Sequence, residues 1–198
     1  MSKIGLTSVA AKLSANGMET TVVSDTAAAR QAVLGIIPEG ARVMTMTSVT
    51  LDSLDLPRQI NDSGKYYSVR KELLSLDRDT QSLQVNKLGS APDYAVGSVH
   101  AVTASGQVII ASNTGSQLPA YAYGATHVIW VVGRQKIVTN LNAAFKRIYD
   151  HILPLESERA NKAYGITTGS FVSKLLIINR EIKPGRIKII LVRQELGF

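Results

Sequence analysis

The chain has 198 residues, of which 45% are hydrophobic and 19% charged, and it contains no cysteine. Its length and apolar content predict one folded domain over residues 1–198 and argue against a disordered segment. The absence of thiols excludes disulfides, thiolate catalysis, cysteine-type zinc sites and cysteine-ligated iron–sulfur clusters. Apolar runs fall short of the ~18 residues of a membrane span, and the polar N-terminus differs from a secretory signal, so we expect a soluble, cytoplasmic protein.

The net charge of +7 comes from basic residues that are spread along the sequence. Because they form no block of about five or more like charges, the sequence does not indicate nucleic-acid binding. The excess favours either an ordinary solvated surface or a field that attracts small anions or an acidic partner. The three histidines, His100, His127 and His151, show no short metal-ligand spacing, so we expect no metal site.

The first part of the sequence alternates helix and strand. Apolar residues at i, i+3, i+4 and i+7 from Leu6 predict a helix, which belongs to an N-terminal segment (residues 1–20) packed on the domain. β-branched and apolar residues predict strands at 20–23 and 42–46, with a helix between them that ends before Pro38. This β-α-β order favours parallel strands.

Three hydroxyl side chains follow the second strand, directly before or within a short predicted helix: Thr47, Ser48 and Thr50. A helix N-terminus exposes unpaired N–H groups and a partial positive charge, so this cluster is a candidate anion site. The alternative is that Ser48 or Thr50 only caps the helix.

The most informative run extends from Tyr94 to Gly133 and combines two hairpin strands, a polar loop, a helix and a further strand. The strands are predicted at 93–102 and 107–111, with a tight turn at 104–106 between them. A loop rich in serine, threonine and glycine follows, at a place where phosphates and carboxylates are commonly bound. Its candidate binding residues are Ser112, Thr114, Gly115 and Ser116.

The nearly all-apolar stretch 126–132 predicts a strand that is covered on both faces. Arg134 and Lys136 follow it directly. If the strand pattern continues, their side chains point to the same side, either toward a ligand or toward solvent. An amphipathic helix is predicted at 141–152, before Pro154.

Strands at 175–179 and 187–192 are predicted to pair as a hairpin at the end of the chain. The fold class is therefore α/β: an open, mostly parallel, Rossmann-like sheet with helices on both faces and a C-terminal antiparallel hairpin. Open α/β sheets bind ligands at the carboxyl ends of their strands, and the three polar clusters follow strand ends. Together they would give a carboxylate or phosphate charge-assisted hydrogen bonds.

Five segments of the chain resemble the LUD (lactate utilisation) domain family, in the expected order and spacing. The resemblance covers most of the chain from residue 44 onward. It implies the wider fold group of ribose-5-phosphate isomerase, glucosamine-6-phosphate deaminase and coenzyme A transferases, which shares a fold and an anion-binding face but no single reaction. The segments are MTMTSVTLDSL (44–54), YAVGSVHAVTASGQVIIAS (94–112), GSQLPAYAYGATHVIWVVGRQKIV (115–138), LPLESERA (153–160) and KLLIINRE to GRIKIILVRQELGF (174–198).

The family resemblance implies a role in the oxidation of L-lactate to pyruvate beside iron–sulfur partner subunits. Because the chain has no cysteine, such clusters would belong to the partners, and we expect no cofactor in this chain. Relatives often carry an acidic residue in the hairpin turn where this sequence has Ala104. Its absence weakens a coenzyme A transferase interpretation, since that mechanism needs a carboxylate nucleophile.

Two residues are weaker candidates for catalysis. Glu158 is either a general base or the ion-pair partner of a neighbouring arginine, and His100 is either a proton donor or an ordinary strand-edge histidine. Three hypotheses follow for the whole chain: a small-anion-binding subunit of a lactate-oxidation system, a free-standing sugar-phosphate- or coenzyme A-binding enzyme, and a non-catalytic scaffold. A homo-oligomer is compatible with each of them.

Overall fold

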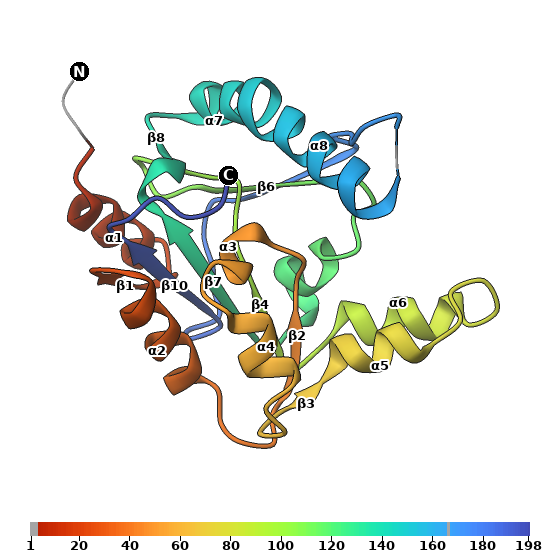
Figure 1. Cartoon of the computed structure of the whole chain (residues 1–198). Coiled ribbons are helices and arrows are strands. Elements are labelled where there is room, and N and C mark those ends of the chain that lie inside the picture. Colours follow the sequence, from red (N-terminus) through yellow and green to blue (C-terminus); the bar gives the residue numbers. More distant parts are fainter. Residues whose placement is uncertain (1–3, 166) are drawn as a thin grey trace.

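The computed structural model describes residues 4–165 and 167–198 and shows an α/β fold built on two sheets (Figure 1). Residues 1–3 of the predicted N-terminal segment lie outside the described residues. Sheet A has strand order β1-β10-β7-β4-β2-β3, and every pairing in it is parallel, which confirms the predicted open parallel sheet. Its strands are β1 (Glu19–Val23), β2 (Arg42–Thr45), β3 (Tyr67–Ser68), β4 (Tyr94–Gly97), β7 (His127–Gly133) and β10 (Ile187–Val192).

Sheet B is a smaller mixed sheet with strand order β8-β5-β6-β9. The predicted hairpin is present in it, because β5 and β6 pair antiparallel on either side of a turn in which Gly106 has a φ of +82°. That left-handed conformation favours glycine, as the Ser-Gly pair in the sequence indicated. The strands of sheet B are β5 (Ala101–Thr103), β6 (Val108–Ser112), β8 (Ile137–Val138) and β9 (Lys174–Ile178).

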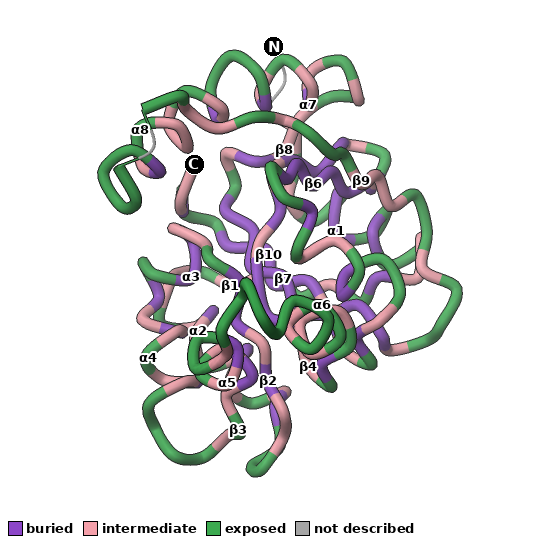
Figure 2. Tube along the Cα trace, turned by 90° about the vertical axis from the view of Figure 1, so that its right-hand side faces the viewer, coloured by how far each residue is buried: buried purple, intermediate pink, exposed green. Residues whose placement is uncertain are grey.

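The two faces of sheet A bury different side chains of the same strand, as the apolar stretch 126–132 predicts. In β7, Trp130 and its i±2 neighbours face sheet B and α1, whereas Ile129 and Val131 face α2, α3 and α4. Every residue of β5 and β6, and every residue of β7 after its first, is buried (Figure 2). The helices named are α1 (Leu6–Ala15), α2 (Thr26–Ile36), α3 (Val49–Asp52) and α4 (Leu56–Asn61).

A second helical layer covers the outer face of sheet B. It consists of α7 (Leu141–Arg147), a π-helical turn (Ile148–Ile152) and α8 (Leu153–Tyr164), which continue one another above the sheet (Figure 1). Two further helices, α5 (Val69–Ser75) and α6 (Ser82–Ser90), project from the side of the molecule as an arm. No helix in the described part of the chain is long and apolar enough to cross a membrane.

The terminal hairpin is not formed, and this part of the prediction was wrong. β9 pairs antiparallel with β6 at the edge of sheet B, whereas β10 lies inside sheet A, parallel to both β1 and β7. The reason is burial. β10 is apolar on both faces, which suits a central strand, and β9 is exposed at Lys174 and Leu175, which suits an edge.

The strand predicted at 93–102 is divided between the two sheets. Its first half is β4 in sheet A and its second half is β5 in sheet B, with Ser98, Val99 and His100 in the crossing between them. Both halves are apolar, so the local pattern does not reveal the break. The crossing has a functional consequence, because it places Ser98 and His100 at the carboxyl end of β4.

The close approach of β4 to the π-helical turn Ala120–Gly124 gives a test of this packing. A Cβ atom on Gly97 would overlap the hydroxyl group of the buried Tyr121. We expect Gly97→Ala to lower the free energy of unfolding by about 1–3 kcal/mol, measured by urea denaturation.

Gly35→Ala is the matched control. Gly35 is exposed in α2 and an added Cβ would meet no atom within 4 Å, so this variant should gain about 0.5–1 kcal/mol. Equal stabilities for the two variants would contradict the packing described for Gly97.

Candidate anion-binding site

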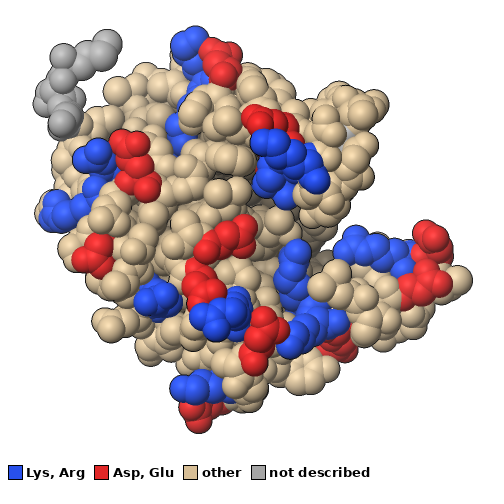
Figure 3. Space-filling view, in the orientation of Figure 1, with Lys and Arg blue, Asp and Glu red and all other residues tan. Residues whose placement is uncertain are grey.

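A cavity of about 390 Å³ lies at the carboxyl edge of sheet A, between that edge, sheet B and α8. Figure 3 shows the surface hollowed between the part that contains α8 and the arm of α5 and α6, with basic side chains along the hollow. Most of the residues that the sequence indicated line this one cavity: Thr47, Ser48, Thr50, His100, Ser112, Thr114, Ser116 and Lys136.

Lys136 is the central feature of the cavity. Its side chain is buried at 5% exposure, and Nζ donates hydrogen bonds to Thr50 Oγ1 at 2.9 Å and Ser98 Oγ at 3.0 Å. Both hydroxyls already donate their own protons to main-chain carbonyls, Thr50 to Leu196 O and Ser98 to Val131 O. They can therefore only accept from Lys136, which leaves the amine one further position for a ligand.

The environment of Lys136 disfavours its charged form. Burial lowers the pKa of Lys136 to about 7, and the positive charge of Arg147 acts in the same direction. Its hydrogen-bond partners within the described residues are two neutral hydroxyls, not a carboxylate. Burial therefore favours the neutral amine, and an anion beside it would favour the protonated form instead.

His100 lines the same cavity, but as a neutral group. Its Nδ1 accepts the N–H of Ala111 at 3.1 Å, which assigns the ring proton to Nε2. Burial lowers the pKa of His100 to about 3, and the charges of Lys136 and Arg147 add to the effect. At neutral pH the ring therefore serves as a hydrogen-bond donor through Nε2, and not as a proton acceptor.

Arg70 brings a second cation to the cavity. Its guanidinium donates to Thr45 O and to Thr47 Oγ1, at 3.2 and 2.9 Å, and none of the ion pairs among the described residues includes it. Arg159 also lines the cavity, but Glu156 neutralises it through a bidentate pair. Arg70, Arg159 and Lys136 thus face the cavity with one carboxylate, so these side chains carry an excess of two positive charges when Lys136 is protonated and of one when it is neutral.

The polar groups of the loop from Ser112 to Ser116 bond to one another more than the sequence indicated. The N–H of Gly115 donates to Ser112 Oγ at 2.8 Å, and the N–H of Ser116 donates to Thr114 Oγ1. Gly115 itself does not line the cavity, and its φ of +88° shows that it serves the turn. The loop consequently offers hydroxyl groups to a ligand more than free N–H groups.

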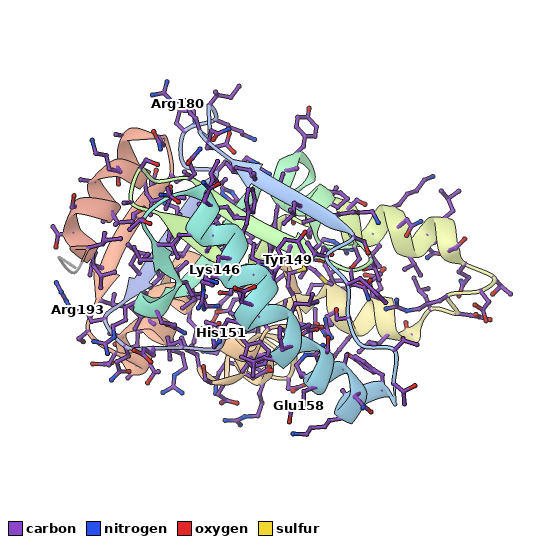
Figure 4. The ribbon with its side chains drawn as sticks, turned by 90° about the horizontal axis from the view of Figure 1, so that it is seen from above. Lys146, Tyr149, His151, Glu158, Arg180 and Arg193 are labelled. Atoms are coloured by element: carbon purple, nitrogen blue, oxygen red, sulfur yellow. The ribbon has the colours of Figure 1, made fainter. Side chains whose placement is uncertain are left out.

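Two further candidates lie outside the cavity. Gly133 ends β7 and a 3-10 turn (Arg134–Lys136) follows, so Arg134 and Lys136 do not share a side: Arg134 pairs with Glu195 at the surface. Glu158 lies on the outer surface of α8 (Figure 4). There Lys162 Nζ, at 2.6 Å, holds the pKa of that carboxyl below its usual range. The structural alternative for Glu158 thus fits the geometry, with a lysine in place of the expected arginine.

The LUD domain family matches residues 6–192, nearly the whole chain. The chain belongs to the LUD domain family. A crystal structure of a DUF162 family protein from Deinococcus radiodurans, at 1.70 Å resolution, is similar in fold with a TM-score of 0.58. The identity is 15%, and the match covers 98% of this chain and 99% of that one. No curated protein matches the sequence.

The cavity around Lys136 contains two polar side chains that the sequence did not indicate. Ser98 was hidden in a strand-like run, and Arg70 lies in the segment between Leu56 and Leu88, which has no clear pattern. Both reach the site through tertiary structure, Ser98 by the crossing between sheets and Arg70 from the start of α5. No local signal marks either residue.

A larger hollow of about 710 Å³ lies between α5 and α6, against Arg42 at the first residue of β2. It is at the opposite end of the strands from Lys136, and its charged lining includes Glu72 paired with Arg42. The carboxyl edge therefore remains the better site, since ligands of open α/β sheets bind there. Within the described ranges, no group of three or more histidine, aspartate or glutamate side chains could hold a metal ion.

The buried amine predicts a specific pH dependence of stability. Between about pH 7 and the ordinary lysine value of 10.5, the unfolded chain binds a proton at Lys136 that the folded protein does not. Stability of the wild type should therefore rise with pH across this window, and below it the full cost of burying the charge applies.

Lys136→Met removes this cost, so we expect the ligand-free variant to be more stable than the wild type by about 1–3 kcal/mol near pH 6. The difference should shrink toward about pH 9–10, as measured by urea unfolding over a pH series. Lys146→Met is the control, because Lys146 is exposed and paired with Asp150. A difference that does not change with pH would contradict the buried position of the amine.

Proposed function

We propose that this LUD protein binds a small 2-hydroxy or 2-oxo carboxylate, such as L-lactate or pyruvate, in the Lys136 cavity. We further propose that it acts in lactate oxidation together with iron–sulfur partner proteins. The family name supports the substrate class. One structural observation carries the proposal: Lys136 and Arg70 face one cavity, and hydroxyl groups and a main-chain carbonyl are their hydrogen-bond partners among the described residues.

Each of these residues has a defined role in the proposed complex. The Lys136 ammonium uses its remaining N–H to bind a carboxylate oxygen, and Thr50 and Ser98 hold Nζ in place. Arg70 supplies a second positive charge at the end of β2, where it donates to Thr45 O. Nε2 of His100 donates to the hydroxyl or oxo oxygen of the ligand, which distinguishes such acids from simple carboxylates.

The electron transfer itself needs another component. Oxidation of a 2-hydroxy acid releases two electrons with two protons, and this chain has no cysteine with which to bind an iron–sulfur cluster. The proposed role of the chain is therefore to bind and orient the acid, while a partner accepts the electrons. Ala104 lies in the β5–β6 turn and does not line the cavity, so a nucleophile at this position is not part of the proposal.

A thermal-shift experiment with L-lactate, pyruvate, inorganic phosphate and coenzyme A tests the ligand class. We expect lactate and pyruvate to raise the melting temperature of the wild type. Lys136→Met should lose about 10–100-fold in affinity, because a charge-assisted hydrogen bond is removed.

Arg134→Met is the matched control, since Arg134 is two residues away but pairs with Glu195 at the surface. It should bind like the wild type. A shift with phosphate or coenzyme A alone would favour the sugar-phosphate or coenzyme A alternative, and no shift with any compound would leave the scaffold hypothesis.

Carboxylate affinity should also depend on pH. The bound anion stabilises the protonated form of Lys136, whose pKa in the free protein is about 7. Binding above this value takes up a proton, so affinity should fall with rising pH, approaching about tenfold per unit. Isothermal titration calorimetry across about pH 6–9 in buffers of different ionisation enthalpy measures both effects, and a flat profile with no proton uptake would contradict Lys136 as the anchor.

A further inference from the structure

The cavity is large compared with lactate. Its volume is about 390 Å³. It also lies within the range of roughly 300–1,000 Å³ that is typical of pockets for much larger ligands. Lactate carries only a methyl group beside its carboxylate and hydroxyl, so it would leave most of this space to solvent.

The lining of the cavity is divided by chemistry. The side formed by the carboxyl edge of sheet A is polar and cationic, with Lys136, Thr50 and Ser98. The π-helical turn and α8 on the opposite side contribute Ile152 and Ala160, both buried, and the neutralised pair Arg159–Glu156. A ligand that fills the cavity therefore meets unpaired cations and hydroxyl groups at one end, and apolar side chains beside one neutralised ion pair at the other.

Two large aromatic side chains extend this apolar wall to the rim. Phe171 is 57% exposed and Tyr164 is 62% exposed, although both line the cavity. Large exposed apolar side chains that gather at a cavity, and are not scattered singly, indicate a surface that a ligand covers. This observation is independent of the buried lysine.

We propose that the cavity selects a 2-hydroxy or 2-oxo acid with a bulky aliphatic or aromatic side chain, whose carboxylate binds at Lys136 and whose apolar body packs against Ile152, Phe171 and Tyr164. The inference rests on the proposed function for the position of the carboxylate. It goes further in assigning the size and polarity of the rest of the ligand. Lactate is then a minimal ligand that uses only the polar end.

Calorimetry with three acids that share one head group tests this assignment: L-lactate, L-2-hydroxyisocaproate and L-3-phenyllactate. We expect affinity to rise along the series, with phenyllactate at least about tenfold tighter than lactate, because each added apolar group is removed from water. Binding of the larger acids should also show a more negative heat-capacity change than binding of lactate.

Variants at the rim separate the two ends of the ligand. Phe171→Ala and Tyr164→Ala should reduce the preference for phenyllactate over lactate several-fold, and their exposed positions make unfolding an unsuitable explanation. Tyr123→Ala is the control, because Tyr123 is 90% exposed and does not line this cavity, and it should leave the preference unchanged.

The outcomes distinguish this inference from the proposed function. Equal or weaker binding of phenyllactate, or a preference that survives both rim variants, would overturn the apolar assignment and leave the Lys136 anion site standing. Binding of all three acids that persists in Lys136→Met would overturn the position of the carboxylate. Absence of binding by all three acids would overturn both proposals.

Discussion

The amine of Lys136 is held by two hydroxyl groups whose own protons are already engaged. Thr50 donates to Leu196 O and Ser98 donates to Val131 O, so neither can turn away from the lysine without breaking a bond to the main chain. These contacts join α3, the crossing between the sheets, β7 and the residues near the C-terminus around one buried nitrogen. Gln135 completes the arrangement, because its amide bonds both the N–H and the carbonyl of Leu196.

Burying a positive charge in this way is unfavourable in the ligand-free protein. Close packing of the surrounding residues holds the hydroxyl partners of Lys136 in place. Gly197 illustrates the constraint: a Cβ atom there would overlap Thr50 Oγ1. Such a site is stable because the two sheets and their helices fix its walls, and an anion lowers the remaining cost. Structure and electrostatics thus support the proposed negatively charged ligand, and they do so independently of the family to which the chain belongs.

The division of the cavity into a cationic end and an apolar wall follows from the layer order. The polar end is the carboxyl edge of a parallel sheet, where strand ends and helix starts gather hydroxyl and basic groups. The apolar wall comes from the turn Ile148–Ile152, which packs on sheet B, and from Ala160 of α8. A cavity between the two layers therefore acquires both kinds of surface, although α8 also contributes the neutralised pair Arg159–Glu156.

Local sequence patterns were sufficient for the elements that are buried on one stripe or on two faces. Four features could be recognised in the sequence: the stripe of α1, the apolar run of β7, the glycine at the β5–β6 turn and the family resemblance. They gave the fold class and most of the residues around Lys136.

Periodicity reports only whether a segment is buried, however, not which sheet receives it. The sequence alone could therefore not determine that 93–102 divides between two sheets or that β9 and β10 separate. For the same reason it predicted that Arg134 and Lys136 point to the same side, whereas only Lys136 turns inward: the difference depends on a 3-10 turn after β7 and on hydroxyl partners far away in the chain. The chemistry of each side chain and the tendency of each segment to be buried were determined by the local sequence. The convergence of Lys136, Ser98 and Arg70 was decided by long-range packing.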